Sequence, residues 1–305
     1  MRRLPIAVAL SLVLVASCAG ESGDSATGPP AGPPRGITLR AVKFCSAAGS
    51  DLLLDLHLPA GQAGPRVPVA LFLHGGGWTS GTRDDSRWLG LLREPLLARG
   101  IAVATADYRL APEHRWPAQL EDAKCAVRFL RASAERFGFD SDAIGAWGSS
   151  AGGHLAAMLG TTEPGAFEGD GGHPGVSSRV HAVVDLWGPA DLTSREGWPP
   201  GHEAVFRLVF GTSDPDSPVL AAASPVFHVT ADDSPFLILH GDEDALVPLR
   251  QSRALADRLD AAGVEARLVV VEGGDHGLTP RAHPFTPSRS ELIGTIAAFF
   301  ETRLR

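Results

Sequence analysis

The sequence predicts an α/β fold, in which a mostly parallel, eight-stranded sheet carries helices on both faces. From residue 37 onward, short apolar runs rich in β-branched residues alternate with segments whose apolar residues recur every three or four positions. The apolar runs end in glycine or polar residues, as strands buried on both faces do. With 44% hydrophobic and 20% charged residues, the 305-residue chain can bury a large core. This alternation implies parallel strands joined by right-handed crossovers.

The expected elements begin with a hairpin, in which residues 36–45 pair with residues 51–59 through a turn at 47–50. Buried strands are expected next at 69–77 and 101–110. A helix is expected over 117–138, because Pro117 opens the segment and Gly138 ends it. The pattern then repeats, with strands at 143–148, 181–188, 235–241 and 266–273 and helices at 151–159, 249–263 and from about residue 288.

Two stretches interrupt the alternation. Residues 161–179 are rich in glycine with scattered acidic residues, and residues 193–230 contain an apolar piece near 204–210. Insertions between the late strands of such sheets often cover the mouth of a site, although the first stretch could equally be a plain surface loop.

The first 36 residues form two segments that precede the folded domain. Arg2 and Arg3 stand before an apolar run that is too short to span a bilayer, which predicts an export signal over residues 1–17. The sequence Val-Ala-Ser-Cys at 15–18 resembles the lipobox of bacterial lipoproteins, which implies lipidation of Cys18 and attachment to a membrane on its extracytoplasmic side. An ordinary signal peptide, cleaved after residue 19 or 20 to give a secreted protein, is the alternative. Residues 18–36 contain two proline pairs and no apolar periodicity, so we expect a tether before a domain at 37–305.

Charge and cysteine content narrow the classes of partner. The formal net charge is −8, and loss of Arg2 and Arg3 would make it two units more negative, which argues against nucleic acid and anionic lipid surfaces as partners. Besides Cys18, only Cys45 and Cys125 are present, and an oxidising compartment favours a disulfide between them. Helical spacing places Cys125 opposite the apolar stripe, so a partner would have to approach from outside. A disulfide and two inert thiols both remain open.

A candidate nucleophile lies where the strand at 143–148 meets the helix at 151–159. Gly148, Ser150 and Gly152 fit the G-x-S-x-G nucleophile elbow, a sharp turn that lifts the serine oxygen above the sheet edge. Ser149 would need a glycine at position 147, where the chain has Trp147. The amide of Ala151 would stand in the positive field at the N-terminus of the helix.

Further residues complete a possible catalytic apparatus. The sequence His-Gly-Gly-Gly-Trp at 74–78 ends an early strand, and its glycine amides can complete an oxyanion hole with Ala151. We expect His74 to orient this loop rather than act as a base. In this chain order the acid and then the histidine follow the serine. Residues 240–248 offer Asp242, Glu243 and Asp244, and residues 272–278 offer His276. His276 follows a strand and is flanked by glycines; His283, in a loop near prolines, is its main rival.

Together these motifs, with Tyr-Arg-Leu-Ala-Pro-Glu at 108–113, resemble the α/β-hydrolase esterases related to hormone-sensitive lipase, and especially the feruloyl-esterase-like branch. The resemblance covers about residues 40–300 and implies an α/β-hydrolase fold. It implies Ser150 as nucleophile, His276 as base, Asp244 of the D-x-x-V-P pattern as the orienting acid, and the amides of Gly76, Gly77 and Ala151 as the oxyanion hole. The 108–113 segment would be a structural loop near the site.

The resemblance predicts a serine carboxylesterase that acts on short-chain or aryl esters, free or attached to polysaccharide. A serine carboxylesterase of this kind requires no cofactor or metal. The sequence contains no P-loop, C-x-x-C or H-E-x-x-H motif. Lipase-like members often have Asp where this chain has Ser149, and an N-terminal helical cap for which there is no room before residue 37. An open site is therefore expected.

Two alternatives stay open at this stage. The D-x-x-V-P pattern also resembles prolyl-oligopeptidase-type exopeptidases or amidases, although those usually carry a propeller domain, and aryl formamidases share an HGG-x-W turn. A non-catalytic surface binding protein on a hydrolase scaffold is the alternative from another class. The natural ester and the oligomeric state do not follow from the sequence.

Overall fold

The computed structural model describes residues 36–60, 66–84, 86–279 and 284–305, all within one compact unit, Gly32–Arg305. The predicted signal, Cys18, the tether up to residue 35 and His283 lie outside the described residues. No helix among the described residues is long and apolar enough to cross a membrane.

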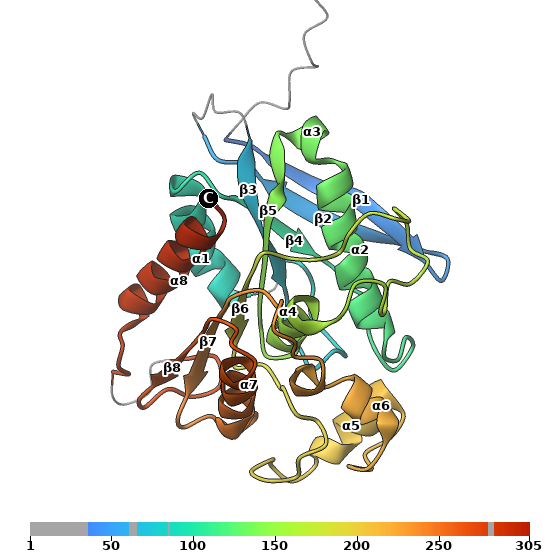
Figure 1. Ribbon diagram of the computed structural model, residues 1–305, viewed down its shortest axis with the longest axis vertical. Helices are drawn as coiled ribbons and strands as arrows, with labels where there is room; N and C mark the ends of the chain where they lie inside the picture. Colours follow the sequence, from blue (N-terminus) through green and yellow to red (C-terminus); the bar gives the residue numbers. More distant parts are fainter. Residues whose placement is uncertain (1–35, 61–65, 85, 280–283) are drawn as a thin grey trace, which may run out of the picture. The chain divides into compact units, whose positions relative to one another are not determined.

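A single eight-stranded sheet forms the centre of this unit, in the order β1-β2-β4-β3-β5-β6-β7-β8 (Figure 1). The antiparallel part is β1 (Thr38–Ala47) and β2 (Ser50–His57), with β2 also antiparallel to β4 (Ala102–Ala106). The remaining neighbours are parallel: β3 (Val67–Leu73), β5 (Phe139–Ser149), β6 (Ala182–Leu186), β7 (Phe236–Gly241) and β8 (Ala266–Val271). The predicted mostly parallel sheet is confirmed.

Helices cover both faces of the sheet, as predicted. One face packs on α2 (Ala118–Ala132), α4 (Ala151–Thr161) and α7 (Arg250–Ala261), and the other on α1 (Arg87–Ala98) and α8 (Arg289–Arg303) (Figure 1). The expected helix over 117–138 breaks at Ser133, and its last turn is the short α3 (Ala134–Phe137). Gly138 ends it in a left-handed conformation, φ 72°.

Helix α1 was not expected from the sequence. Its apolar residues do recur at helical spacing after the N-cap Ser86, but Pro95 lies inside it. Pro95 removes one backbone hydrogen bond of the helix, and burial of Leu92 and Leu96 in the core compensates for that loss.

The first insertion covers the outer side of α2 and explains how the two cysteines meet. Cys45 and Cys125 form a disulfide between β1 and α2, with their Cα atoms 6.4 Å apart. An ideal Cβ on Gly171 would lie only 3.2 Å from Cys125 Sγ, so the insertion packs directly over the bond. Glu168 pairs with the buried side chains of Lys124 and Arg128. The stretch is therefore a packed cover, and the outward face of α2 is buried.

Candidate active site

Ser150 lies on the sharp turn between β5 and α4, in the geometry that the elbow pattern predicts. Its backbone has φ 55° and ψ −119°, a conformation that non-glycine residues rarely adopt. The flanking glycines are required by contact. A Cβ on Gly148 would lie 2.3 Å from the carbonyl oxygen of Gly152, and one on Gly152 would lie 2.0 Å from the carbonyl oxygen of Leu73. The turn can therefore form only where both side chains are missing.

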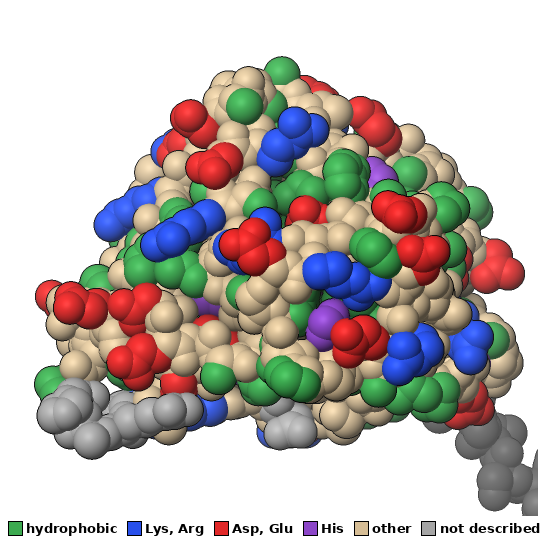
Figure 2. Space-filling model, turned by 90° about the horizontal axis from the view of Figure 1, so that it is seen from below, with side chains coloured by type: hydrophobic (Ala, Val, Ile, Leu, Met, Phe, Trp, Pro, Cys, Tyr) green, Lys and Arg blue, Asp and Glu red, His purple; other side chains and the backbone are tan. Residues whose placement is uncertain are grey.

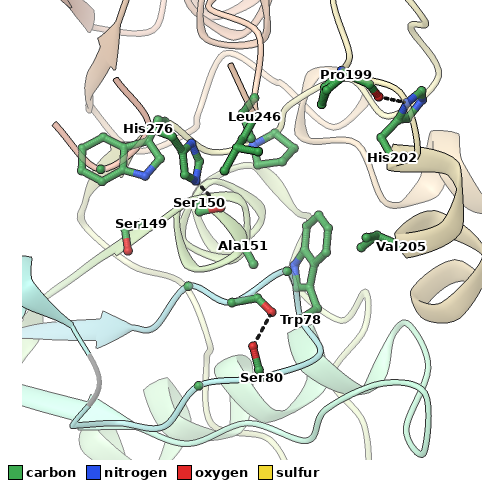
Figure 3. A pocket seen from close by; sticks show the side chains of 18 of the residues that line it. Trp78, Ser80, Ser149, Ser150, Ala151, Pro199, His202, Val205, Leu246 and His276 are labelled. Atoms are coloured by element: carbon green, nitrogen blue, oxygen red, sulfur yellow. Dashed lines mark hydrogen bonds between the residues drawn. The ribbon is translucent and has the colours of Figure 1, made fainter. Parts of the chain in front are cut away.

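Three side chains from separate loops meet at this turn. Asp244 follows β7 and His276 follows β8, and both loops leave the carboxyl ends of their strands, as Ser150 does. His276 Nδ1 donates to Asp244 Oδ2 at 2.7 Å. Ser150 Oγ donates to His276 Nε2 at 3.1 Å (Figure 3). Since a carboxylate only accepts, the histidine proton lies on Nδ1 and Nε2 is free to accept from the serine. The structure brings together the three residues named from the sequence.

Asp244 is enclosed and fully hydrogen-bonded. Its Oδ1 accepts from the amides of Leu246 and Val247, at 2.8 and 2.9 Å, and its side chain has no solvent exposure. Burial by itself raises the pKa of this carboxyl, but hydrogen bonds from His240 and His276 outweigh it and hold the pKa well below its usual range. The group is therefore a permanent carboxylate that can hold His276 in one orientation.

The glycine loop after β3 lies across the turn from α4. Gly76 and Gly77 have φ of 108° and 60°, and with Ala151 they line the same pocket as Ser150. The segment at 108–113 braces this loop, because the Tyr108 hydroxyl donates to the carbonyl of His74 at 2.8 Å. The His74 ring stacks on Tyr108, with ring centroids 4.1 Å apart, and its Nδ1 lies 2.7 Å from the carbonyl oxygen of Gly75. These contacts agree with a structural role for His74.

Above the serine lies a pocket of about 780 Å³ with largely apolar walls. Seven of the lining residues are tryptophan or proline: Trp78, Trp88, Trp187, Trp198, Pro189, Pro199 and Pro200. Trp187 is packed edge-on to His276, with ring centroids 6.1 Å apart. No Asp or Glu is among the described residues that line the pocket, and the described part of the chain holds no cluster of metal-ligating side chains.

The second insertion forms one wall of the pocket. It forms α5 (His202–Phe210), α6 (Pro218–Ala222) and the 3₁₀ turn η1 (Pro225–Phe227), and its residues 198–206 make one side of the pocket. The described residues contain no N-terminal cap. The insertion between β6 and β7 forms part of the pocket wall. From below, where Figure 1 places α5 and α6, the surface mixes acidic, basic and hydrophobic side chains without a continuous patch of either charge (Figure 2).

Several residues that shape the site were not found from the sequence. Trp88 donates its indole N–H to the carbonyl of Gly277, beside His276, at 2.9 Å, and it belongs to the unexpected α1. His240 Nε2 lies 2.9 Å from the carbonyl oxygen of Val247 and 3.3 Å from Asp244 Oδ2. The sequence contains these aromatic residues, but only the tertiary structure shows which of them line the pocket.

Comparison with known proteins places the chain in a family. The BD-FAE family profile matches residues 54–259. The chain belongs to the BD-FAE family. Esterase LipC of Mycobacterium tuberculosis is 34% identical over 229 residues, which is 74% of this chain and 56% of LipC. The chain thus spans a little over half the length of this curated relative.

Two solved structures support the same BD-FAE assignment. A truncated carbohydrate esterase from gut microbiota has a TM-score of 0.73 and 28% identity, covering 90% of this chain and 99% of that one. Est2, a thermophilic esterase of Thermogutta terrifontis with propionate bound, has a TM-score of 0.70 and 29% identity, covering 87% and 93%. The resemblance inferred from the motifs and the α/β-hydrolase fold are both confirmed. The BD-FAE match includes the glycine loop, the elbow and Asp244, whereas His276 lies beyond it.

Proposed function

We propose that the protein is a serine carboxylesterase that hydrolyses short-chain or aryl carboxylic esters, free or attached to polysaccharide. The observation that carries the proposal is the hydrogen-bonded chain from Asp244 through His276 to Ser150, in which His276 and Ser150 line a largely apolar pocket. Relatives and structural neighbours that are named esterases also support hydrolysis of an ester bond.

In the proposed reaction, Ser150 Oγ attacks the ester carbonyl while His276 Nε2 takes its proton. The amides of Gly76, Gly77 and Ala151 hold the negative charge on the carbonyl oxygen; each such donor contributes about 10²- to 10³-fold to the rate. His276 then gives its proton to the leaving alcohol, and the acyl group remains on Ser150. Water then attacks the acyl carbon while His276 takes one of its protons. The bond between the acyl carbon and Ser150 Oγ breaks, His276 returns the proton to Oγ, and the acid leaves. Asp244 keeps the imidazole oriented and stabilises its charged form.

Hydrolysis of p-nitrophenyl esters from acetate to palmitate tests this proposal directly. Purified wild-type protein is compared with Ser150→Ala and with Ser149→Ala as the matched control. We expect hydrolysis of short-chain esters that is lost with Ser150→Ala and kept with Ser149→Ala. A folded wild-type protein that cleaves no ester would contradict the proposal, and cleavage of peptide amides instead would favour the amidase alternative.

From the sequence alone we also propose that the chain is exported and anchored through lipidated Cys18, with residues 18–36 as the tether. Mass spectrometry of the mature N-terminus in a bacterial host tests this. An acylated residue 18 is the expected result, and a free terminus after residue 19 or 20 would identify an ordinary secreted protein.

A further inference from the structure

Trp78 forms a fixed wall of the pocket directly after the oxyanion glycines. Its side chain is 3% exposed, and its carbonyl accepts from the amide of Ala111 at 2.9 Å. Figure 3 shows Trp78 and Val205 on the side of Ser150 away from His276. Since His276 must protonate the leaving alcohol, the alcohol part of the ester lies on the histidine side. The acyl part therefore extends toward Trp78.

His154 holds the Trp78 indole from within the elbow helix. Trp78 Nε1 donates to His154 Nδ1 at 3.2 Å, and His154 Nε2 donates to the carbonyl of Ala223 at 2.7 Å. An indole N–H only donates and a carbonyl only accepts, so these two bonds require a neutral ring with its proton on Nε2. Complete burial lowers the pKa of His154 to about 4, which keeps the ring neutral at ordinary pH.

The same ring ties three parts of the site together. Trp78 belongs to the oxyanion loop, His154 to α4 and Ala223 to the second insertion, just after α6. The indole also packs edge-on against Phe210 of α5, with ring centroids 5.3 Å apart. Any shift of His154 therefore changes the position of Trp78 relative to both the serine and the insertion.

Helix α5 lies beside the oxyanion loop, and Val205 of this helix lines the pocket. An ideal Cβ on Gly77 would be 3.9 Å from Val205 Cγ1, which is ordinary van der Waals contact. Helix α5 is held in place there, since the amide of Trp116 donates to the carbonyl of Val209 at 2.9 Å. Trp78 and Val205 thus bound an acyl compartment, defined here as the part of the pocket between these two side chains.

We propose that His154 is a positioning residue whose hydrogen bond fixes Trp78 as the end wall of the acyl compartment, so that the enzyme selects esters of short acyl chains. This inference rests on the proposed esterase function. It assigns acyl selection to a buried histidine that contacts neither the substrate nor the three side chains of the proposed triad.

The test compares kcat and KM for p-nitrophenyl acetate, butyrate, hexanoate and octanoate. The variants are His154→Phe, which keeps a ring and loses both hydrogen bonds, and Trp78→Ala. Each methylene that gains contact is worth about fourfold in kcat/KM. We expect the ratio of kcat/KM for octanoate to kcat/KM for acetate to rise roughly tenfold or more in both variants, because KM for octanoate falls. In His154→Phe, we expect kcat for acetate to change by less than about threefold.

Val205→Trp tests the opposite direction without disturbing the core, because Val205 is 36% exposed. Val205→Trp should lower the ratio of kcat/KM for butyrate to kcat/KM for acetate. Leu208→Trp, on the same helix but outside the pocket lining, should leave that ratio unchanged. If His154→Phe does not fold, Trp78→Phe takes its place, because it keeps a ring and loses the N–H that donates to His154. The same rise in the octanoate-to-acetate ratio of kcat/KM is then expected, and an unchanged ratio would overturn the positioning role.

The results separate the two proposals. A wild-type protein active on esters, with the same acyl preference in His154→Phe and Val205→Trp, would overturn the positioning role alone. An equal loss of kcat for all four esters in His154→Phe would also overturn it, since that is the effect of general loosening. A folded wild-type protein that cleaves no ester would overturn both.

Discussion

Replacing Asp244 with asparagine should nearly abolish turnover while leaving the fold intact. Oδ1 of Asp244 accepts from two backbone amides, those of Leu246 and Val247, and only a carbonyl oxygen can take its place. The new NH₂ group must therefore face His276 Nδ1 at the position of Oδ2, where it donates instead of accepting. His276 Nδ1 then loses its proton, and Nε2 carries it toward Ser150. In this tautomer the ring has no lone pair for the serine proton.

The expected loss is about 10⁴-fold in kcat, the size of effect that the wrong histidine tautomer produces in a serine triad. At 1.36 kcal/mol per tenfold, this corresponds to roughly 5 kcal/mol of transition-state stabilisation. KM should change little, because Asp244 does not line the pocket. The neighbouring His240 keeps its bond to the carbonyl of Val247 in the variant, so we expect no large loss of stability.

Steady-state hydrolysis of p-nitrophenyl acetate measures the effect, with thermal unfolding as the check on folding. Glu243→Gln is the matched control, because it removes an exposed carboxylate one residue away. Its kcat should stay within about twofold of wild type. The reasoning would be refuted if folded Asp244→Asn kept a tenth or more of the activity, or if Glu243→Gln lost as much.

Three further predictions concern stability. Gly152→Ala places a Cβ 2.0 Å from a backbone carbonyl oxygen and should unfold the protein or lower its free energy of unfolding by more than about 3 kcal/mol. Gly294→Ala in α8, where a Cβ would have nothing within 4 Å, should be neutral or stabilising by up to about 1 kcal/mol. Urea unfolding of both variants checks this, and equal effects would contradict it. Reduction of the Cys45–Cys125 bond opens a loop with a sequence separation of 80 and should cost about 4.5 kcal/mol in the chain-entropy model. Unfolding with and without reductant measures this loss, and two titratable thiols in the native protein would refute the prediction. Burial raises the pKa of Asp185 from 3.8 to about 6, against the opposing effects of the Gly188 amide and His240, so the folded state binds the extra proton and stability should fall as pH rises from about 4 to about 6. Asp185→Asn should remove that fall, of roughly 3 kcal/mol. Urea unfolding at a series of pH values checks this, and a free energy of unfolding that stays constant or rises from pH about 4 to about 6 would contradict it.

The chain order of the motifs was enough to anticipate the layout of the site. The parallel strands β5, β7 and β8 all end at the same edge of the sheet, so the residues that follow them leave the sheet at that edge, however far apart they are in sequence. That is why Ser150, Asp244 and His276 could be named from their positions after apolar runs. The choice of Asp244 over Asp242 and Glu243 needed the family resemblance. In the structure Asp244 has no solvent exposure, and the other two are exposed.

What the sequence alone determined was the alternation of strands and helices, the glycine turns and the elbow. These depend on local requirements, namely apolar periodicity and backbone that tolerates no side chain. Tertiary structure alone decided the walls of the pocket, the disulfide and the partners of His154. Trp78, His154 and Ala223 are far apart along the chain, and no local pattern records that a crossover brings them into contact. The pocket is built from such long-range contacts, whereas the elbow is built from neighbours, so the nucleophile could be read from the sequence and the acyl compartment could not.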